Sequence, residues 1–335
     1  MNDFLRDSGV SAVVPTRNRP ASLRRLLDSL ARQTRLPNET VIVEASDRPE
    51  DEGELRRSYP SLTIRVMLSP PSLCKQRNLG IRSATGEFIL LADDDIEFPP
   101  SYLASILEYA SEHPADGAVS GTLQEPSPDG PTVPDQAPLR PARLLWSFMF
   151  QTSVWGSFAE VRKYAWLNPI IRFFERRKNT FTLAGWPLLT EARPPAFRTA
   201  IYGLGAAMVR RSWLLNAPYD ERLDTSGIGD NFGVAIQLPG ERPIVVLTGV
   251  SYLHHRSPEE RVPRARAYAL RLLALDLFLS QSQKFHVIHR ILLRWSLLGS
   301  ALGFAITGSP RMAAAALSVL LRMSLGRGYR ARRGG

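Results

Sequence analysis

Cysteine is almost absent from this sequence, and so are long hydrophobic runs. The 335 residues include one cysteine, Cys74, which excludes an intramolecular disulfide framework and fits a reducing compartment. Residues 295–310 lack charge and residues 312–321 are largely apolar, but neither segment reaches the ~20 residues needed to cross a bilayer. The polar start of the chain, residues 1–9, has no signal-peptide pattern. We therefore expect a cytoplasmic protein.

Acidic residues are outnumbered by basic ones, since 32 Asp and Glu against 42 Lys and Arg give a net charge of +10. Nucleic acid, an anionic membrane surface and an anionic substrate are the partners that such a charge favours. The basic residues concentrate in residues 172–178 and 327–333, without a recognisable nucleic-acid-binding module. We therefore predict no nucleic-acid partner.

The C-terminal part of the chain has a pattern of its own. Residues 264–280 predict an amphipathic helix, and the two uncharged segments that follow are flanked by arginines. They fit either a helical hairpin packed on the rest of the chain or a hairpin lying on an anionic membrane surface. The arginine bias favours the membrane alternative, which extends the expected localisation to peripheral attachment at the inner face of the cell membrane. The flanking arginines are Arg290, Arg294, Arg311, Arg322 and those within 327–333.

Short apolar strands alternate with helices through the first hundred residues. This alternation predicts an α/β fold with a mostly parallel, Rossmann-like sheet flanked by helices. Further along, the pattern predicts a glycine-containing strand, a short helix and two more strands. The expected strands are 11–15, 41–43, 62–68, 88–92, 202–209, 244–247 and 250–253, and the expected helices are 22–33, 50–58, 72–83 and 212–216.

Polar clusters follow three of the predicted strands, at Pro15-Thr16, at residues 44–47 and at residues 93–95. Open α/β sheets bind ligands beyond the carboxyl ends of their strands, so the three clusters together favour a nucleotide site. Three adjacent carboxylates repel one another and resist burial, which indicates a bound divalent metal. An EF-hand is excluded, because Phe98 stands where glycine is needed and Ala104 where the bidentate Glu belongs.

The predicted domain organisation has two parts. Residues 1–260 form the α/β domain, with residues 121–200 as an irregular insertion at the acceptor side of the sheet. Residues 261–335 form a basic helical extension. The proline-rich stretch 126–141 lacks periodicity and reads as a surface connection within the insertion.

Five sequence segments together resemble the family 2 glycosyltransferases, which have the GT-A fold. The resemblance covers about residues 10–260 and implies inverting, hexosyltransferase-like transfer of a sugar from a nucleotide diphosphate-sugar to an acceptor hydroxyl. A saccharide or a lipid-linked saccharide is the implied acceptor, in polysaccharide or glycolipid synthesis. The matching segments are 13–19, 41–47, 77–81, 84–95 and 219–223.

The resemblance also assigns the donor site. The end of the first strand lines the nucleotide pocket, and Glu44 takes the base-contacting position where Asp is frequent, so the identity of the base stays open. Lys75 and Arg77 are placed to meet the diphosphate, although each also fits an exposed helical face. The implied nucleotide-sugar-binding residues are Pro15, Thr16, Arg19, Glu44, Lys75, Arg77, Asp93 and Asp94.

The acid triplet resembles the DxD motif of this family. Asp93 would face ribose or metal and Asp95 would bind the metal, Mn²⁺ or Mg²⁺. Strand alternation would turn these two side chains to one face and Asp94 to the other. His254 is the third implied ligand, as metal or phosphate contact, with His255 as its alternative. The implied metal set is Asp93, Asp95 and His254.

Inversion in one displacement needs a general base for the acceptor hydroxyl. The family's usual Glu-Asp pair corresponds to Gly229-Asp230, at the centre of an expected flexible loop, so Asp230 is the predicted base. Asp224 and Asp220 are its alternatives. The missing Glu also leaves open a non-catalytic nucleotide-sugar-binding homologue. A sugar nucleotidyltransferase is disfavoured, because residues 15–19 lack the glycine of a triphosphate loop.

Overall fold

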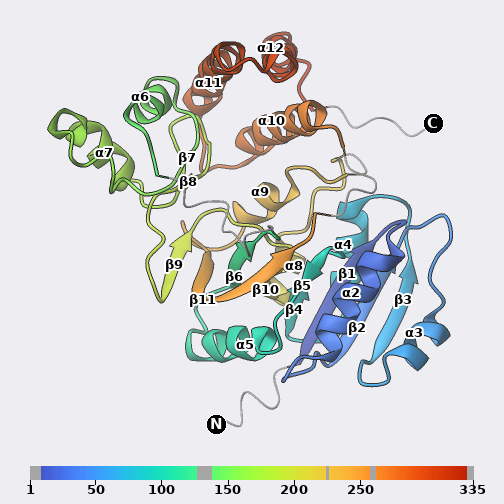
Figure 1. Cartoon of the computed structure of the whole chain (residues 1–335). Helices are drawn as coiled ribbons and strands as arrows, with labels where there is room; N and C mark the ends of the chain where they lie inside the picture. The colour runs from blue at the N-terminus through green and yellow to red at the C-terminus, as the bar shows by residue number, and fades with distance from the viewer. Residues whose placement is uncertain (1–8, 127–137, 224–225, 257–261, 330–335) are drawn as a thin grey trace.

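A computed structural model describes residues 9–126, 138–223, 226–256 and 262–329, and Figure 1 shows how their elements are arranged. In this part of the chain a nine-stranded sheet occupies the centre, with helices on both faces and three further helices at the C-terminal end. Its strands are β1 (Val10–Thr16), β2 (Glu39–Glu44), β3 (Ile64–Leu68), β4 (Phe88–Leu91), β5 (Ile96–Glu97), β6 (Ala118–Gln124), β9 (Ala196–Thr199), β10 (Met208–Arg210) and β11 (Ile244–His254).

The sheet has the strand order β3-β2-β1-β4-β10-β6-β11-β5, and β9 pairs with β11. Strands β1 to β4 pair in parallel, whereas β10 is antiparallel to both β4 and β6 and β11 is parallel to β6. The predicted fold class is confirmed. The helices around the sheet are α2 (Pro20–Ala31), α3 (Glu52–Ser58), α4 (Leu73–Ser83), α5 (Tyr102–Glu112), α8 (Arg211–Asn216) and α9 (Asp230–Ala235).

The first strand shows why helices cover both faces. All of β1 is buried, and successive side chains of a strand point to opposite faces. Val10, Ala12 and Val14 enter the hydrophobic cluster that includes α2 and α5, whereas Val13 enters the cluster that includes α4, α8 and α9. A strand buried on both sides reads as a continuous apolar run, which is the pattern that the sequence presents.

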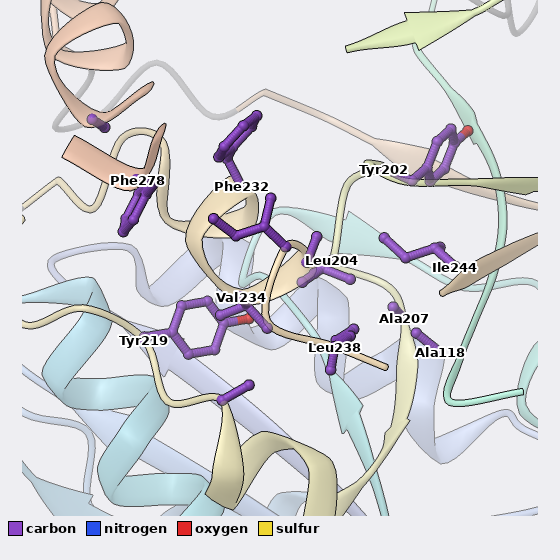
Figure 2. Close-up of a cluster of buried hydrophobic side chains, with 14 of the residues drawn as sticks. Ala118, Tyr202, Leu204, Ala207, Tyr219, Phe232, Val234, Leu238, Ile244 and Phe278 are labelled. Carbon is purple, nitrogen blue, oxygen red and sulfur yellow. The ribbon is translucent and has the colours of Figure 1, made fainter. Parts of the chain in front are cut away.

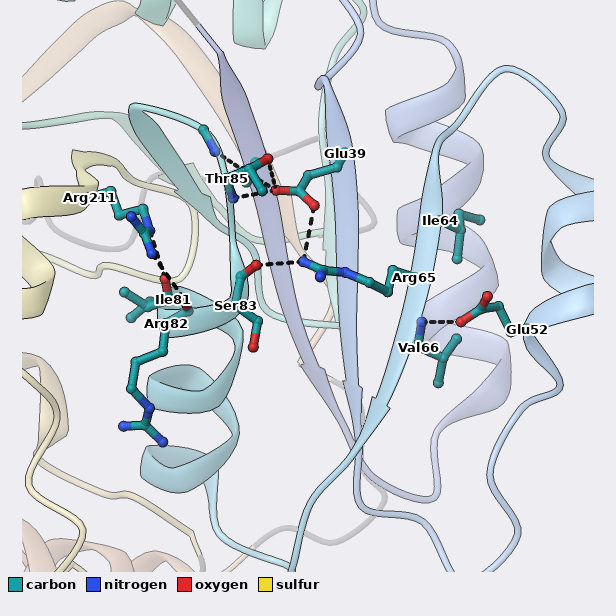
Figure 3. Close-up of polar contacts among 12 residues, drawn as sticks. Glu39, Glu52, Ile64, Arg65, Val66, Ile81, Arg82, Ser83, Thr85 and Arg211 are labelled. Atoms are coloured by element: carbon teal, nitrogen blue, oxygen red, sulfur yellow. Dashed lines mark hydrogen bonds and ion pairs between the residues drawn. The ribbon is translucent and has the colours of Figure 1, made fainter.

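A network of hydrogen bonds fixes the end of the sheet that lies opposite the predicted site (Figure 3). Glu39 at the start of β2 accepts hydrogen bonds from Ser11, from Thr85 and from Arg65, which also donates to the carbonyl of Ser83. At the edge strand β3, the amide of Val66 donates to the carboxylate of Glu52 at 2.7 Å. These contacts pair strand-edge groups and fix the positions of β2, β3 and α4.

Two strand predictions are corrected. The predicted strand 202–209 is reduced to β10, Met208–Arg210, because residues 201–207 form a loop at the carboxyl end of β4. The two strands predicted over 244–253 are one strand, β11, whose pairing with β6 shifts register between Leu247 and Ser251. Gly249 lies inside this shift, and glycine in a strand commonly marks such an irregularity.

The segment 121–200 is not irregular throughout, which corrects a third prediction. It begins in β6 and ends in β9, and between them a separate hydrophobic cluster includes Leu144, Phe158 and Phe174. Residues 127–137, which hold most of the proline-rich stretch, lie outside the described residues. The other elements are α6 (Pro141–Phe150), β7 (Val154–Trp155), η1 (Ala165–Leu167), α7 (Asn168–Glu175) and β8 (Leu188–Leu189).

The C-terminal helices are α10 (Arg264–Gln281), α11 (Val287–Ile306) and α12 (Pro310–Ser324). Helix α10 packs on the sheet domain, because Phe278 stacks on Phe232 of α9 with ring centroids 6.2 Å apart (Figure 2). Helices α11 and α12 pack on each other and on α10. Among the described residues, none of the helices is long and apolar enough to span a membrane.

Candidate active site

Two adjoining cavities lie at the carboxyl ends of β1, β2 and β4. The smaller, about 370 Å³, lies beyond the ends of β1 and β2 and is lined by Glu44, Ser46 and Asp47. The larger, about 490 Å³, is lined by the acid triplet, His254 and residues from α10. Thr16 and Arg19 line both cavities, so the two adjoin at these residues and together make up the cleft. The predicted strand-end clusters are thus brought together.

The acid triplet forms a turn between β4 and β5 rather than a continuation of β4. The expected alternation of the three side chains is therefore wrong, because strand periodicity ends at Leu91. Asp93, Asp94 and Asp95 all line the larger cavity, and each carboxylate has a different protein partner. These separate partners offset the mutual repulsion and the desolvation that disfavour three adjacent carboxylates.

Asp93 pairs with Arg77 of α4 at 2.5 Å, and its amide donates to the carbonyl of Gly205 at 2.8 Å. A Cβ atom at position 205 would clash with the Asp93 carboxylate, so the loop after residue 201 needs glycine here. Arg77 itself is only 3% exposed. It lies beneath the cleft, between two carboxylates.

Asp94 accepts a hydrogen bond from Thr16 at 2.8 Å and pairs with Arg19 at 3.1 Å. These contacts join the acid triplet to the end of β1. Burial raises the pKa of Asp94 to about 6, although Arg19 and the Thr16 hydroxyl act in the opposite direction. Asp94 is therefore a structural link between the two predicted halves of the donor site as well as a lining residue.

Asp95 and His254 form the next pair, with 3.1 Å between Oδ1 and Nε2. The antiparallel pairing of β5 with β11 places them together, because His254 lies opposite Ile96 in the register. The adjacent His255 instead contacts Glu97 through its ring at 2.9 Å. His254 lines the cavity and His255 does not, so the geometry favours the first of the two predicted histidines.

Asp230 is the first residue of α9, which corrects the expectation of a flexible loop at this position. Its carboxylate pairs with the Arg77 guanidinium and is 6% exposed. Burial raises the pKa of Asp230 to about 6, and Asp93 adds to this rise, whereas Arg77 opposes it. Burial alone would lower the Arg77 pKa, but the two carboxylates outweigh it and raise that pKa. Asp230 does not line either cavity; Ser226 and Ile228, just before it, do.

Gly229 occupies the position where the family pattern has Glu, and its surroundings account for the difference. Its φ of +96° is a conformation that side-chain-bearing residues rarely adopt. A Cβ atom there would also lie 2.6 Å from the Cβ of Ala274 on α10. The close packing of α10 against α9 therefore leaves no room for a second acid.

Three predicted binding residues are placed differently from the others. Lys75 is exposed on α4, whereas Arg77 is buried between Asp93 and Asp230, and neither lines a cavity. Glu44 lines the smaller cavity but is 2% exposed, and its carboxylate accepts hydrogen bonds from the amide and hydroxyl of Ser46. The Glu44 carboxylate is thus engaged by the loop that follows β2, and Asp47 and Glu50 are the other acids that line that cavity.

Sequence reasoning missed residues that build or line the cleft. The Gln76 side chain donates to the carbonyls of Thr16 and Val43, both at 2.8 Å, and so ties the ends of β1 and β2 to α4. The available signal for Gln76 was its position in the sequence, between the two predicted binding residues Lys75 and Arg77. Arg266 of α10 lines the larger cavity from outside the matched segments, and no local pattern marks it.

The donor set fits a divalent metal that shares its coordination with a ligand. No group of three or more His, Cys, Asp or Glu converges as a metal site within the residues described above. Asp95 and His254 converge as a pair, and Mg²⁺ is commonly bound by one or two protein groups plus substrate phosphate oxygens. The chemistry of these residues is therefore compatible with Mn²⁺ or Mg²⁺ held partly by a diphosphate.

Comparison with known proteins supports the resemblance. Residues 11–169 match the family model described as glycosyl transferase family 2. An uncharacterised glycosyltransferase of Bacillus subtilis, YwdF, is 36% identical over 96 residues, which are 28% of this chain and 35% of the relative. The chain thus matches about a third of that relative's length.

Solved structures share the fold. S. aureus TarS 1-349, in complex with UDP-GlcNAc, has a TM-score of 0.51 at 14% identity and covers 96% of this chain and 93% of its own. GalNAc-T7, with UDP, GalNAc and Mn²⁺, has a TM-score of 0.54 at 13% identity and covers 90% of this chain and 58% of its own. The predicted resemblance is confirmed for residues 11–169, which have the sequence pattern of the family 2 glycosyltransferases, and the chain has a GT-A fold.

Proposed function

We propose that this protein is a metal-dependent, inverting glycosyltransferase that moves a sugar from a nucleotide diphosphate-sugar to an acceptor hydroxyl. The observation that carries the proposal is the pair of adjoining cavities at the carboxyl ends of the parallel strands, with Asp93, Asp94 and Asp95 lining the larger one. A role in polysaccharide or glycolipid synthesis is part of the proposal. The neighbours that were solved with UDP-GlcNAc or with UDP, GalNAc and Mn²⁺ support the donor class and the metal.

In this proposal the nucleoside lies in the smaller cavity, beside Glu44, and the diphosphate and sugar lie in the larger one. Arg19 lines both and carries positive charge toward the junction where the diphosphate would sit. Asp95 and His254 would hold the metal, which supplies charge neutralisation for the departing nucleoside diphosphate. Lys75 and Arg77 line neither cavity, so their assignment to the diphosphate is not part of this proposal.

Asp230 is the proposed general base. Its carboxylate has a pKa of about 6, close to the range in which a base is both ionised and able to accept a proton. Arg77 holds this carboxylate away from the cavity, so proton transfer requires Asp230 to turn toward the acceptor substrate. Ile228, two residues earlier, lines the larger cavity.

An anionic membrane surface is the proposed partner of the C-terminal helices. One face of α11 exposes large apolar side chains along a helix of about 30 Å, and no Asp or Glu follows Asp276, whereas nine Lys and Arg do. Amphipathic helices of this composition lie in the headgroup region of anionic bilayers. The exposed residues are Val287, Ile288, Ile291, Trp295, Leu298, Leu302 and Ile306.

Flotation with vesicles tests this partner. The full chain should float with anionic vesicles and not with zwitterionic ones, and the double variant Ile291→Ser/Leu298→Ser should lose flotation. Leu68→Ser is the matched control, since it removes an exposed leucine from the edge strand β3. Equal flotation of the double variant and the control would contradict the proposal.

A nucleotide screen tests the donor site before any acceptor is known. Thermal unfolding is followed with UDP, GDP, dTDP and CDP, each with and without Mn²⁺. A ligand present at about 100 times its Kd should stabilise the fold by about 2.7 kcal/mol, and we expect one nucleotide to do so only with metal. Absence of metal-dependent stabilisation by every nucleotide would overturn the proposal.

A second function, binding of nucleotide-sugar without catalysis, is favoured by one observation. Asp230 is buried against Arg77, outside both cavities, and Gly229 replaces the second acid. The two functions differ in donor consumption. A protein that binds the nucleotide with metal, but neither hydrolyses the donor nor transfers its sugar to any offered acceptor, would be the binding homologue.

A further inference from the structure

An aromatic-lined groove lies between α6 and α11, next to the active-site cleft. Its volume is about 590 Å³, within the range of small-molecule sites. Four aromatic residues line it: Trp146 of α6, Trp186, Tyr268 of α10 and Phe304 of α11. The rings of Tyr268 and Phe304 meet edge to face at 5.4 Å. The function proposed above makes no use of this groove.

Five of the polar side chains in the groove already donate hydrogen bonds within the protein. Trp186 Nε1 donates to Ser296 at 2.6 Å, and the hydroxyls of Ser153 and Thr307 donate to carbonyls at 2.6 and 2.9 Å. Thr152 and Ser300 donate in the same way, to Ser147 and to a carbonyl. Among the described residues, no Asp, Glu, Asn or Gln lines the groove. A saccharide needs hydrogen-bond partners for its hydroxyls and finds few here, whereas a hydrocarbon chain needs none.

The groove adjoins two other features. Ile306 lines it and is 75% exposed, so its apolar surface meets the exposed face of α11. On the other side, Arg266 and Ala267 line the active-site cleft while the next residue of α10, Tyr268, lines the groove. A molecule that crosses α10 at this turn would place a polar head near the cleft and an apolar tail in the groove. Arg143 is the charged residue among those lining the groove, which suits an anionic linkage.

We propose that this groove binds the hydrocarbon chain of a lipid-linked acceptor whose saccharide enters the neighbouring cleft. This proposal rests on the glycosyltransferase function and names its acceptor class, an amphiphile with a phosphate-type linkage. Burial of the chain among aromatic and aliphatic side chains supplies affinity that does not depend on the sugar being transferred. Arg143 pairs with the negative charge at the entrance.

Gly303 offers a substitution that fills the groove without distorting the fold. A Cβ atom there would lie 3.6 to 3.7 Å from the Trp146 ring, which is ordinary contact, and the residue lies inside α11. Gly303→Leu therefore occupies groove volume and raises helix propensity. Ala305→Leu is the matched control, because it adds a leucine to an exposed position of α11 that does not line the groove.

The binding test uses farnesyl monophosphate, below its aggregation concentration, with tryptophan fluorescence of the full chain as the readout. We expect saturable binding to the native chain and to Ala305→Leu, and binding roughly tenfold weaker or more to Gly303→Leu, because the leucine excludes part of the chain. Inorganic phosphate and maltotriose should not displace the probe. Displacement by maltotriose would show a saccharide site and overturn the proposal. Equal binding by both leucine variants would also overturn it.

This test needs neither donor nor metal, so its failure is distinguishable from failure of the proposed function. A chain that binds farnesyl phosphate in the groove but is never stabilised by a nucleotide with metal would keep the lipid site and lose the glycosyltransferase assignment. A chain stabilised by nucleotide, whose Gly303→Leu variant binds the probe normally, would keep the enzyme and lose the lipid site. Unfolding midpoints of both leucine variants verify that the fold is intact.

Discussion

Arg77 joins the predicted base to the predicted donor site, because its one guanidinium pairs with both Asp230 and Asp93. These carboxylates come from a helix start and a strand end that are 137 residues apart in the sequence. The guanidinium is fully enclosed, so the pairing is only weakly screened by solvent. Any change at Arg77 should therefore act on the acceptor and donor sides of the cleft together.

The first prediction concerns removal of this cation. Arg77→Met leaves Asp93 in the cavity wall and the buried Asp230 without their partner, and loss of one member of a buried ion pair typically costs about 3–5 kcal/mol of unfolding free energy. Chemical denaturation measures this loss. Arg222→Ala is the control, since Arg222 pairs with Asp220 at the surface and should change stability by no more than about 1 kcal/mol. Similar losses in the two variants would contradict the buried pairing.

The second prediction is an acidic limit on activity. Asp230 has a pKa of about 6, so below that pH it is protonated and cannot accept a proton from the acceptor hydroxyl. The rate should fall as pH decreases through about 6, approaching tenfold per pH unit well below it. A pH profile of kcat/KM, measured on the native chain with the donor found in the nucleotide screen, gives this limb.

Asp94 needs a separate control, because burial raises its pKa to about 6 as well. Asp94→Asn should keep the acidic limb if Asp230 is the base. Asp230→Asn should lower kcat by about 10²-fold or more, within the usual contribution of a general base, while metal-dependent nucleotide binding persists. If Asp94→Asn lost the acidic decrease in rate and Asp230→Asn kept it, the titrating group would be Asp94. That result would contradict the assignment of Asp230 as the base.

The third prediction separates the two adjacent histidines. Asp95→Asn and His254→Ala should each abolish most of the extra stabilisation that Mn²⁺ gives to the nucleotide complex, because each removes one of the two converging donors. His255→Ala removes a contact to Glu97 outside the cavity and should leave the metal effect unchanged. Thermal unfolding with nucleotide, with and without Mn²⁺, compares the three variants. A metal effect lost only in His255→Ala would reverse the assignment.

Local sequence patterns predicted the donor side of the cleft better than the acceptor side. The ends of β1, β2 and β4 follow directly from apolar runs that stop at polar residues, so Thr16, Glu44 and Asp93 were placed on one edge of the sheet. The direction of each carboxylate was not predictable in this way, because the chain turns after Leu91 and tertiary partners then decide which way Asp94 and Asp95 point.

The acceptor side depends on contacts that no short window of sequence contains. Asp230 begins α9 where α10 packs against it, with Ala274 lying against Gly229 and Phe278 against Gly233. Helix α10 lies beyond the segments that match the family. The sequence around Gly229-Asp230 therefore could not predict how α10 packs against the predicted base. The same packing explains why the expected Glu is absent.

The fourth prediction follows from that packing. Restoring the family pair with Gly229→Glu should reduce activity rather than raise it. The substitution forces a side chain into a φ of +96° and against Ala274, and backbone strain together with overpacking should cost about 2–4 kcal/mol of unfolding free energy. Gly240→Glu is the matched control for the backbone conformation, because its φ is +88° but a Cβ atom there meets open space. Denaturation of both variants measures the difference that packing makes. A Gly229→Glu variant as stable as Gly240→Glu, and more active than the native chain, would show that the missing acid is a catalytic loss and not a consequence of how α10 packs on α9.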